Sequence, residues 1–124
     1  MKYLIVIPAR LKSSRLPNKP LIKIQGKEIL LRTYERCLLA VNDPKNIIVA
    51  TDHQSIFSFC QENNINVIMT SDHCLTGTDR VYEVAKKINA DTYINVQGDE
   101  PILDPDDLKK IIANVEKDPN KVYN

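Results

Sequence analysis

Runs of consecutive apolar residues alternate along the chain with segments in which apolar positions recur every three or four residues. The first run, YLIVIP at residues 3–8, is aliphatic and β-branched and ends at a proline, which predicts a strand buried on both faces. Similar runs follow at NIIVAT (46–51), NVIMT (66–70) and TYINVQ (92–97). We therefore expect four strands.

The segments between and after these runs predict amphipathic helices, because their apolar residues fall on one face at helical spacing. Asp52, Thr78 and Asp104 are the expected N-caps, since their short side chains can accept hydrogen bonds from the free amides of a first turn. Pro105 suits the first position of a helix. The four expected helices lie at 28–41, 52–64, 77–90 and 104–118.

This alternation of strand and helix predicts an α/β fold with a mainly parallel sheet and helices on both faces. We expect residues 1–124 to form one domain, and its final residues NKVYN look cut short, because a doubly wound sheet would continue into another strand. Ligands of such sheets bind outside the carboxyl ends of the strands. The unusual segments of the chain follow strands in this way, at 9–20, 52–53, 70–78 and 98–104.

Positive charge is concentrated at the start of the chain. Residues 1–27 contain seven of the 17 Lys and Arg residues and none of the 16 Asp and Glu residues. The net charge is only +1, which argues against a nucleic-acid binder, because such proteins spread positive charge over a whole face. We therefore expect a small anionic ligand at this segment.

The basic segment follows the first predicted strand, where nucleotide-binding folds often carry a glycine-rich turn. Neither GxGxxG nor GxxxxGKS/T is present, so a phosphate site here would depend on cationic side chains. Arg10 and Arg15 can offer planar forks to phosphate oxygens, and Lys19 adds a compact charge. Ser13 adds a hydroxyl donor. The alternative interpretation is a solvated basic loop.

The segment NVQGDEP (95–101) is the second candidate. Its strand delivers Gln97, Gly98 allows the backbone to turn or a ligand to approach, and Asp99 follows at the edge of the sheet. A carboxylate placed there can hold Mg²⁺, which takes one or two protein carboxylates and completes its octahedron with phosphates and water. The alternative is an acidic turn without a ligand.

The third candidate is TSDHCLTGTDR (70–80). Gly77 begins a predicted helix whose free amides and dipole attract anions, and Arg80 can reach a carboxylate or phosphate. Arg80 can equally pair with Glu83 on the surface of the helix. His53 and His73 each have only an aspartate beside them, so neither a hydrolase triad nor a metal cluster is supported.

The remaining features bound the class of protein. No apolar run approaches the roughly 20 residues needed to span a membrane, so we expect a cytoplasmic protein without a membrane partner. Cys37, Cys60 and Cys74 are odd in number and widely spaced, which disfavours a disulfide framework or a zinc site. Cys37 and Cys60 are expected to be small apolar core residues.

Four of these motifs together resemble one family. IPARLKSSRLPNKPL (7–21), IIVATDH (47–53), TGTDRV (76–81) and NVQGDEP (95–101) occur in the order and approximate spacing typical of the 3-deoxy-manno-octulosonate (Kdo) cytidylyltransferases, or CMP-Kdo synthetases. The basic loop alone is shared with other cytidylyltransferases of acidic sugars. The resemblance covers the whole chain, which corresponds to the N-terminal half of the family.

This resemblance implies a truncated Rossmann-like nucleotidyltransferase fold that joins CTP to Kdo for lipopolysaccharide biosynthesis and releases pyrophosphate, with Mg²⁺ as cofactor. The full-length family is expected to form homodimers. Carried over by motif, the implied triphosphate contacts are Arg10, Ser13, Arg15 and Lys19, the magnesium ligand is Asp99, and Gln97 with Arg80 would orient the acidic sugar.

Two departures from the family bear on activity. Asn18 stands where the family usually has glycine, and asparagine tolerates a left-handed backbone better than most residues. The second half of the family, which supplies another magnesium carboxylate, much of the sugar pocket and the dimer contacts, is missing. Two alternatives therefore stay open: a cytidylyltransferase for another acidic or amino-substituted sugar, and a nucleotide-binding module without catalysis.

Overall fold

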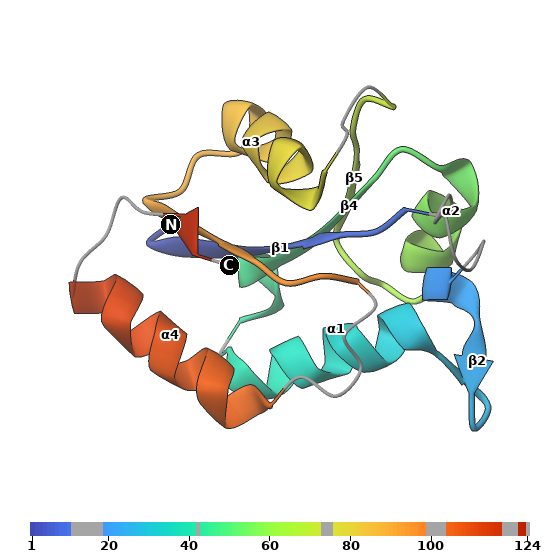
Figure 1. Ribbon diagram of the computed structural model, residues 1–124, viewed down its shortest axis with the longest axis horizontal. Coiled ribbons are helices and arrows are strands. Elements are labelled where there is room, and N and C mark those ends of the chain that lie inside the picture. Colours follow the sequence, from blue (N-terminus) through green and yellow to red (C-terminus); the bar gives the residue numbers. More distant parts are fainter. Residues whose placement is uncertain (11–18, 42, 73–75, 99–103, 118–121, 124) are drawn as a thin grey trace.

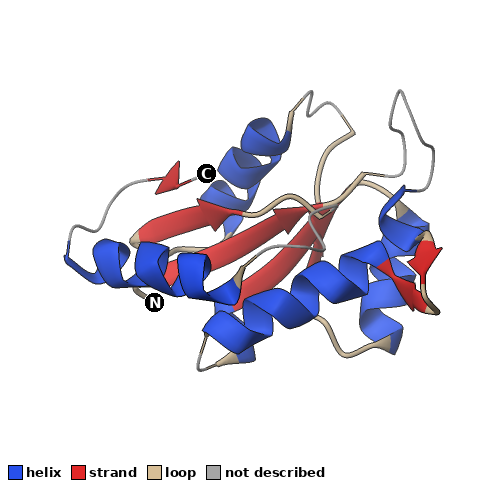
Figure 2. Ribbon diagram, turned by 60° about the horizontal axis from the view of Figure 1, so that its bottom comes forward, coloured by secondary structure: helices blue, strands red, loops and turns tan. Residues whose placement is uncertain are grey.

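The computed structural model describes residues 1–10, 19–41, 43–72, 76–98, 104–117 and 122–123. Within them the main sheet has five strands in the order β5-β4-β1-β6-β7, and each neighbouring pair is parallel (Figures 1 and 2). Its strands are β1 (Tyr3–Pro8), β4 (Ile47–Thr51), β5 (Val67–Met69), β6 (Thr92–Asn95) and β7 (Val122–Tyr123). The four predicted strands are confirmed, and Val122 already begins the fifth.

Four helices connect the strands, close to where their apolar spacing predicted them. They are α1 (Ile29–Ala40), α2 (Gln54–Glu62), α3 (Gly77–Lys87) and α4 (Pro105–Lys117). Short 3₁₀ turns lie at η1 (Lys19–Leu21) and η2 (Pro44–Asn46), and a small antiparallel hairpin joins β2 (Lys23–Ile24) to β3 (Lys27–Glu28).

The order of the strands explains where a ligand site can form. The chain begins in the centre with β1, passes through α1 and α2 to β4 and β5, and then crosses back through α3 to β6 on the other side of β1. The carboxyl ends of the adjacent parallel strands β1 and β6 therefore lie side by side, and ligands of such sheets bind outside the carboxyl ends of the strands. The predicted basic segment and the GDEP segment follow these two strands.

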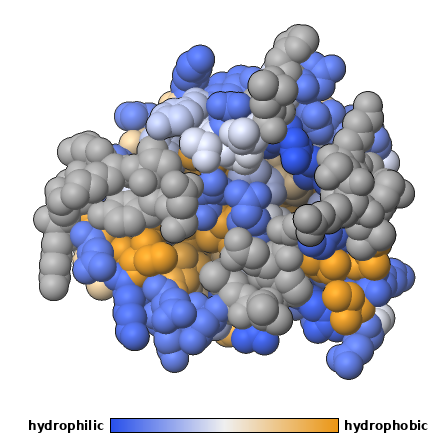
Figure 3. Space-filling view, viewed as in Figure 1, coloured by the Kyte–Doolittle hydropathy of each residue, from blue (hydrophilic) through white to orange (hydrophobic). Residues whose placement is uncertain are grey.

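The sheet separates two apolar cores. Ile5 and Ile7 of β1 face α1, α2 and α4, whereas Leu4 and Val6 face α3, which packs alone on the opposite side (Figure 1). These four side chains are at most 1% exposed. The surface seen in Figure 3 is correspondingly mostly hydrophilic, with apolar side chains confined to patches. The prediction of helices on both faces of a parallel sheet is therefore confirmed.

The helix caps agree with expectation at one helix and differ at two. Asp104 caps α4 by accepting a hydrogen bond from the Asp106 amide at 2.9 Å, as predicted. Helix α3 has its N-cap two residues earlier than expected, at Thr76 rather than Thr78. Helix α2 is capped by the ring of His53 instead of Asp52.

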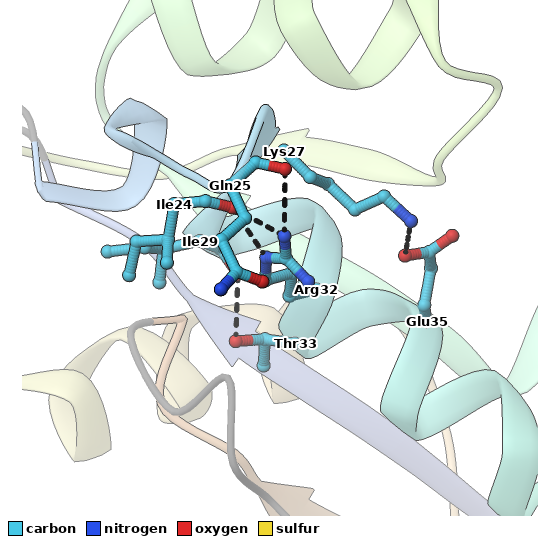
Figure 4. A network of polar contacts seen from close by, with 7 residues as sticks. All are labelled: Ile24, Gln25, Lys27, Ile29, Arg32, Thr33 and Glu35. Atoms are coloured by element: carbon cyan, nitrogen blue, oxygen red, sulfur yellow. Dashed lines mark hydrogen bonds and ion pairs between the residues drawn. The ribbon is translucent and has the colours of Figure 1, made fainter.

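The β2–β3 hairpin was not predicted. Gln25 and Gly26 both have positive φ angles, of 52° and 81°, which suits the two-residue turn of a tight hairpin. Arg32 of α1 holds this turn by donating hydrogen bonds to the carbonyls of Ile24 and Gln25, and Lys27 pairs with Glu35 at 2.7 Å (Figure 4). The chain leaving the basic segment is thereby fastened to α1.

The two described cysteines are core residues, as predicted. Cys37 and Cys60 are both fully buried and neither forms a disulfide. Burial raises the pKa of the Cys60 thiol to about 12. Cys74 lies outside the described residues. None of the helices in the described part of the chain is both long and apolar enough to cross a membrane.

Candidate functional site

The carboxyl ends of β1 and β6 meet directly. The Val96 amide donates to the Val6 carbonyl at 3.0 Å, and the Gly98 amide donates to the Pro8 carbonyl at 3.1 Å. On the other side of β1, the Ala9 amide donates to Ala50 at 2.9 Å. These bonds fix the backbone from which exposed Arg10 leaves the sheet, so the start of the basic segment lies beside the start of the GDEP segment.

Gly98 packs against the end of β1. A Cβ atom placed on it would lie 3.0 Å from the Pro8 carbonyl oxygen and 3.2 Å from the Ala9 Cβ. The Thr33 hydroxyl of α1 also donates to the Gly98 carbonyl at 3.4 Å. We expected this glycine to allow a turn or the approach of a ligand. In the structure, a residue without a side chain is needed here because the two strand ends pack closely.

Lys19 lies near the amino end of α1, the helix whose Thr33 contacts Gly98. It begins η1, which packs against α1, and its carbonyl accepts a hydrogen bond from Ile22 at 3.1 Å. The Ile22 carbonyl in turn accepts from Ile29, the first residue of α1, at 2.9 Å. Gly98 lies against Leu30 and Thr33 of the same helix. Residues beside the basic segment and beside the GDEP segment are therefore both found at the amino end of α1.

Gly77 and Gln97 are brought together although they are 20 residues apart in the sequence. A Cβ atom on Gly77 would lie 2.8 Å from the Gln97 Nε2 atom and 3.2 Å from its Oε1 atom. Gln97 is exposed and donates to the Asn95 side chain at 3.3 Å. The amino end of α3 therefore faces the amide side chain that follows β6, which unites two of the predicted substrate-binding residues.

Arg80 lies three residues after Gly77 in α3 and is fully buried. Its Nη1 atom donates to the Thr70 hydroxyl and to the Ser71 carbonyl, the latter at 3.3 Å, and its Nη2 atom lies 3.6 Å from Asp52 Oδ2. Pairing with Glu83, one of the two expected alternatives, does not occur. The guanidinium points into the protein because three strand-end groups lie there.

Glu83 has other partners. One carboxylate oxygen accepts from the Ser71 amide at 2.6 Å and lies 3.9 Å from Lys87 Nζ. Ser71 is consequently held through both its amide and its carbonyl by side chains of α3. The end of β5 and the first half of α3 thus form one connected polar unit.

Three predicted site residues, Ser13, Arg15 and Asp99, lie outside the described residues, as do Asn18 and His73. The described residues hold no group of three or more His, Cys, Asp or Glu side chains that could bind a metal. His53 uses its Nδ1 atom to accept a hydrogen bond from the Ser55 amide at 3.1 Å.

Two polar residues of this region were not predicted to contact the site. Asp52 was expected to cap a helix, and Thr70 was expected to end a strand and begin the segment 70–78. Both follow neighbouring parallel strands, so their position at the carboxyl edge was an available signal. Their convergence on Arg80 depends on the crossover of α3, which no local pattern reveals.

The arrangement is suited to a polyanionic ligand. A cation leaves β1 at Arg10, Lys19 lies at the adjoining end of α1, and the free amides of the first turn of α3 face the same edge of the sheet. Helix amino ends and basic side chains both attract anions, whereas the Gln97 amide can both donate and accept.

Comparison with known proteins agrees with this geometry. A family model described as Cytidylyltransferase matches residues 4–124. A 3-deoxy-manno-octulosonate cytidylyltransferase of Saccharophagus degradans is 43% identical over 119 residues, which cover 94% of this chain and 46% of the relative. The same enzyme of Escherichia coli is 44% identical over 118 residues, which cover 95% of this chain and 48% of the relative.

Solved structures give the same picture. A CMP:2-keto-3-deoxy-manno-octonic acid synthetase complexed with CTP is 42% identical, with a TM-score of 0.89. The match covers 95% of this chain and 48% of the synthetase chain. A cytidylyltransferase from Leptospira borgpetersenii is 26% identical, with a TM-score of 0.81. The match covers 95% of this chain and 50% of the cytidylyltransferase chain.

The chain thus spans about half the length of the curated relatives it matches. Its strand order, its polar strand ends and the near-complete match to the family model agree with one another. This chain belongs to the cytidylyltransferase family.

Proposed function

We propose that residues 1–124 form a nucleotide-binding domain that binds CTP and contributes to the transfer of CMP to Kdo, giving CMP-Kdo and pyrophosphate. The observation that carries the proposal is the likeness to a synthetase solved with CTP, at 42% identity and a TM-score of 0.89. Lipopolysaccharide biosynthesis is the process that would use the product. The cytoplasm, where CTP is available, is the proposed location.

The proposed roles follow the motifs. Arg10, Ser13, Arg15 and Lys19 would contact the triphosphate, whose negative charge increases on the departing pyrophosphate as the bond to the α-phosphorus breaks. A unit charge pair at about 4 Å contributes roughly 4 kcal/mol at an effective dielectric of about 20, before the costs of desolvation and ordering. Several such contacts are therefore sufficient to hold a triphosphate.

Gln97 is proposed to orient the acidic sugar so that its anomeric hydroxyl approaches the α-phosphorus opposite the pyrophosphate. Its position against Gly77 at the amino end of α3 supports this role. In the transfer, the hydroxyl oxygen forms a bond to the α-phosphorus, the bond from that phosphorus to pyrophosphate breaks, and the hydroxyl proton passes to the surrounding water. The implied contact of Arg80 with the sugar stays a prediction.

Mg²⁺ is the proposed cofactor, with Asp99 as its ligand. Asp99 directly follows Gly98 in the sequence, and Gly98 is packed against the end of β1. When bound, the ion would neutralise charge on the phosphates. One carboxylate suits magnesium, which keeps several waters and shares phosphate ligands.

Calorimetric titration of the chain with CTP and Mg²⁺ tests the binding step. Lys19→Glu should abolish detectable binding, because it replaces an attraction to phosphate with a repulsion. Lys23→Glu is the matched control, since Lys23 is an exposed residue of β2 and should tolerate the same change in charge. Equal loss of binding in both variants would point to a general charge effect and contradict the assignment of Lys19.

Pyrophosphate release from CTP, measured with and without Kdo, tests the reaction. The Escherichia coli relative serves as the positive control, and a panel of other acidic and amino-substituted sugars separates Kdo transfer from a related activity. Asp99→Asn should remove magnesium-dependent release. Unchanged release in Asp99→Asn would refute the metal assignment.

A second candidate is CTP binding without turnover. The observation that favours it is the coverage of less than half of the length of curated relatives. It predicts a rise in the melting temperature with CTP but no Kdo-dependent release of pyrophosphate. A homodimer, expected from the resemblance, stays a prediction for this chain.

A further inference from the structure

We propose that Asp52 is a positioning residue, which holds Arg80 so that the end of β5 and the amino end of α3 keep the geometry needed for nucleotide binding. The consequence for binding rests on the proposed function, whereas the positioning itself does not. Asp52 comes directly after β4, the one strand in the middle of the sheet to which the motifs assigned no site residue.

The geometry around Arg80 is that of a brace between three elements. Arg80 belongs to the first turns of α3, Thr70 and Ser71 follow β5, and Asp52 follows β4. The Nη1 atom of Arg80 binds Thr70 and Ser71, and its Nη2 atom faces Asp52 at 3.6 Å. One guanidinium therefore links the ends of two strands to the helix that follows them.

Burial makes Asp52 the decisive partner. The Arg80 side chain is 0% exposed, whereas the Asp52 side chain is 24% exposed. A buried cation is costly unless an anion compensates it. Among the described residues, Asp52 is the one carboxylate within 4.0 Å of Arg80, and the Nε and Nη2 atoms have no hydrogen-bond partner there. Loss of the Asp52 charge would leave the guanidinium free to turn away from Thr70.

The neighbouring backbone shows which atoms would move. The Thr70 amide donates to Thr51 at 2.8 Å, which pairs the ends of β4 and β5 beside Asp52. Ser71 accepts from Arg80 and donates to Glu83, so both of its backbone groups depend on α3. Without the brace, we expect this strand end and the first turn of α3 to separate.

The amino end of α3 transmits this displacement to the proposed site. Gly77 lies one turn before Arg80 and has so little room that an added Cβ would come within 2.8 Å of Gln97. A small shift of the helix therefore changes the space around Gln97 and the direction of the free amides. Asp52 would act on the ligand through Arg80 and α3 without touching it.

The test combines amide hydrogen exchange in the free protein with CTP titration. Asp52→Asn keeps the size of the side chain and removes its charge. We expect faster exchange of the Ser71, Asp79 and Arg80 amides, unchanged exchange of Leu108 in α4, and a dissociation constant for CTP raised about tenfold. Glu35→Gln, which breaks an exposed ion pair with Lys27, is the matched control and should change neither readout.

A double-mutant cycle measures whether Asp52 and Arg80 act through each other. Arg80→Lys keeps the charge and loses the planar fork, so it should have the same local effect, and Asp52→Asn/Arg80→Lys should be little worse than either variant. Additive effects on local exchange would overturn the proposal. Exchange that rises equally in α3 and α4 would also overturn it, because that pattern indicates general destabilisation.

The two proposals fail in distinguishable ways. A wild-type chain that binds no CTP contradicts the proposed function, while the exchange of Ser71 and Arg80 still decides the positioning. If Asp52→Asn does not fold, Thr70→Val provides the test, since it removes an acceptor of Arg80 and leaves the ion pair. Unchanged local exchange in Thr70→Val would then contradict the brace.

Discussion

Gly98 shows how much the site depends on the absence of a side chain. Gly98→Ala should lower the free energy of unfolding by about 1–3 kcal/mol, because the added methyl would press on the backbone of Pro8 and on Ala9. Urea denaturation followed by circular dichroism measures this loss.

Gly26 offers the control, because its cost has another origin. Nothing lies within 4 Å of a Cβ placed on it, but its φ of 81° disfavours L-residues. Gly26→Ala should cost about 1 kcal/mol, and Gly26→Asn should recover most of that. A Gly98→Ala variant as stable as the wild type would show that the two strand ends are not packed as described.

Gly77→Ala should separate stability from binding. The added Cβ would meet the far end of the Gln97 side chain, which is exposed and able to move, so stability should change by less than about 0.5 kcal/mol. CTP or Kdo binding should weaken because Gln97 is displaced. Denaturation and calorimetry on the same variant measure both effects, and unchanged binding of both ligands would contradict the role of this pair.

Cys60 should be unreactive in the folded protein. Its pKa is raised to about 12 by burial, so the thiol is almost wholly protonated near neutral pH, and only the thiolate reacts readily. In a Cys74→Ser variant, Ellman's reagent should modify neither remaining cysteine until denaturant is added. Rapid modification of the native protein would show that this part of the core opens.

At the scale of the element, the start of α3 can be tested by its cap. The Thr76 hydroxyl oxygen accepts from the Asp79 amide at 3.1 Å, so Thr76→Ala should cost about 1 kcal/mol in the free energy of unfolding. Thr78→Ala, the position that the sequence favoured, should have little effect. Equal losses from the two substitutions in chemical denaturation would contradict the assigned helix start.

The elements also show which local signals were reliable. All four helices were predicted, because α1 to α4 each have an apolar stripe at helical spacing. The His53 cap was missed because Asp52 beside it is the more usual capping residue. The β2–β3 hairpin was missed because its strands are two residues long, which is too short for an alternating pattern, although Gln25-Gly26 carried a turn signal.

At the scale of the whole molecule, the sequence predicted that the site lies at the carboxyl ends of parallel strands, but not which residues meet there. Glu83 lies three positions from Arg80 and was the obvious partner, whereas the actual partner, Asp52, is 28 residues away. The choice depends on the crossover of α3 from β5 to β6. The motifs alone could therefore suggest Arg80 as a site residue without revealing what holds it.

CTP is expected to bind where the carboxyl ends of β1 and β6 meet. Amide chemical-shift mapping of the isotopically labelled chain, titrated with CTP and Mg²⁺, locates the binding site. The largest changes are expected at the amides of Arg10, Gly77, Gln97 and Gly98. Changes confined to the opposite end of the strands, around Lys45 and Asn66, or no changes at saturating CTP, would contradict this expectation.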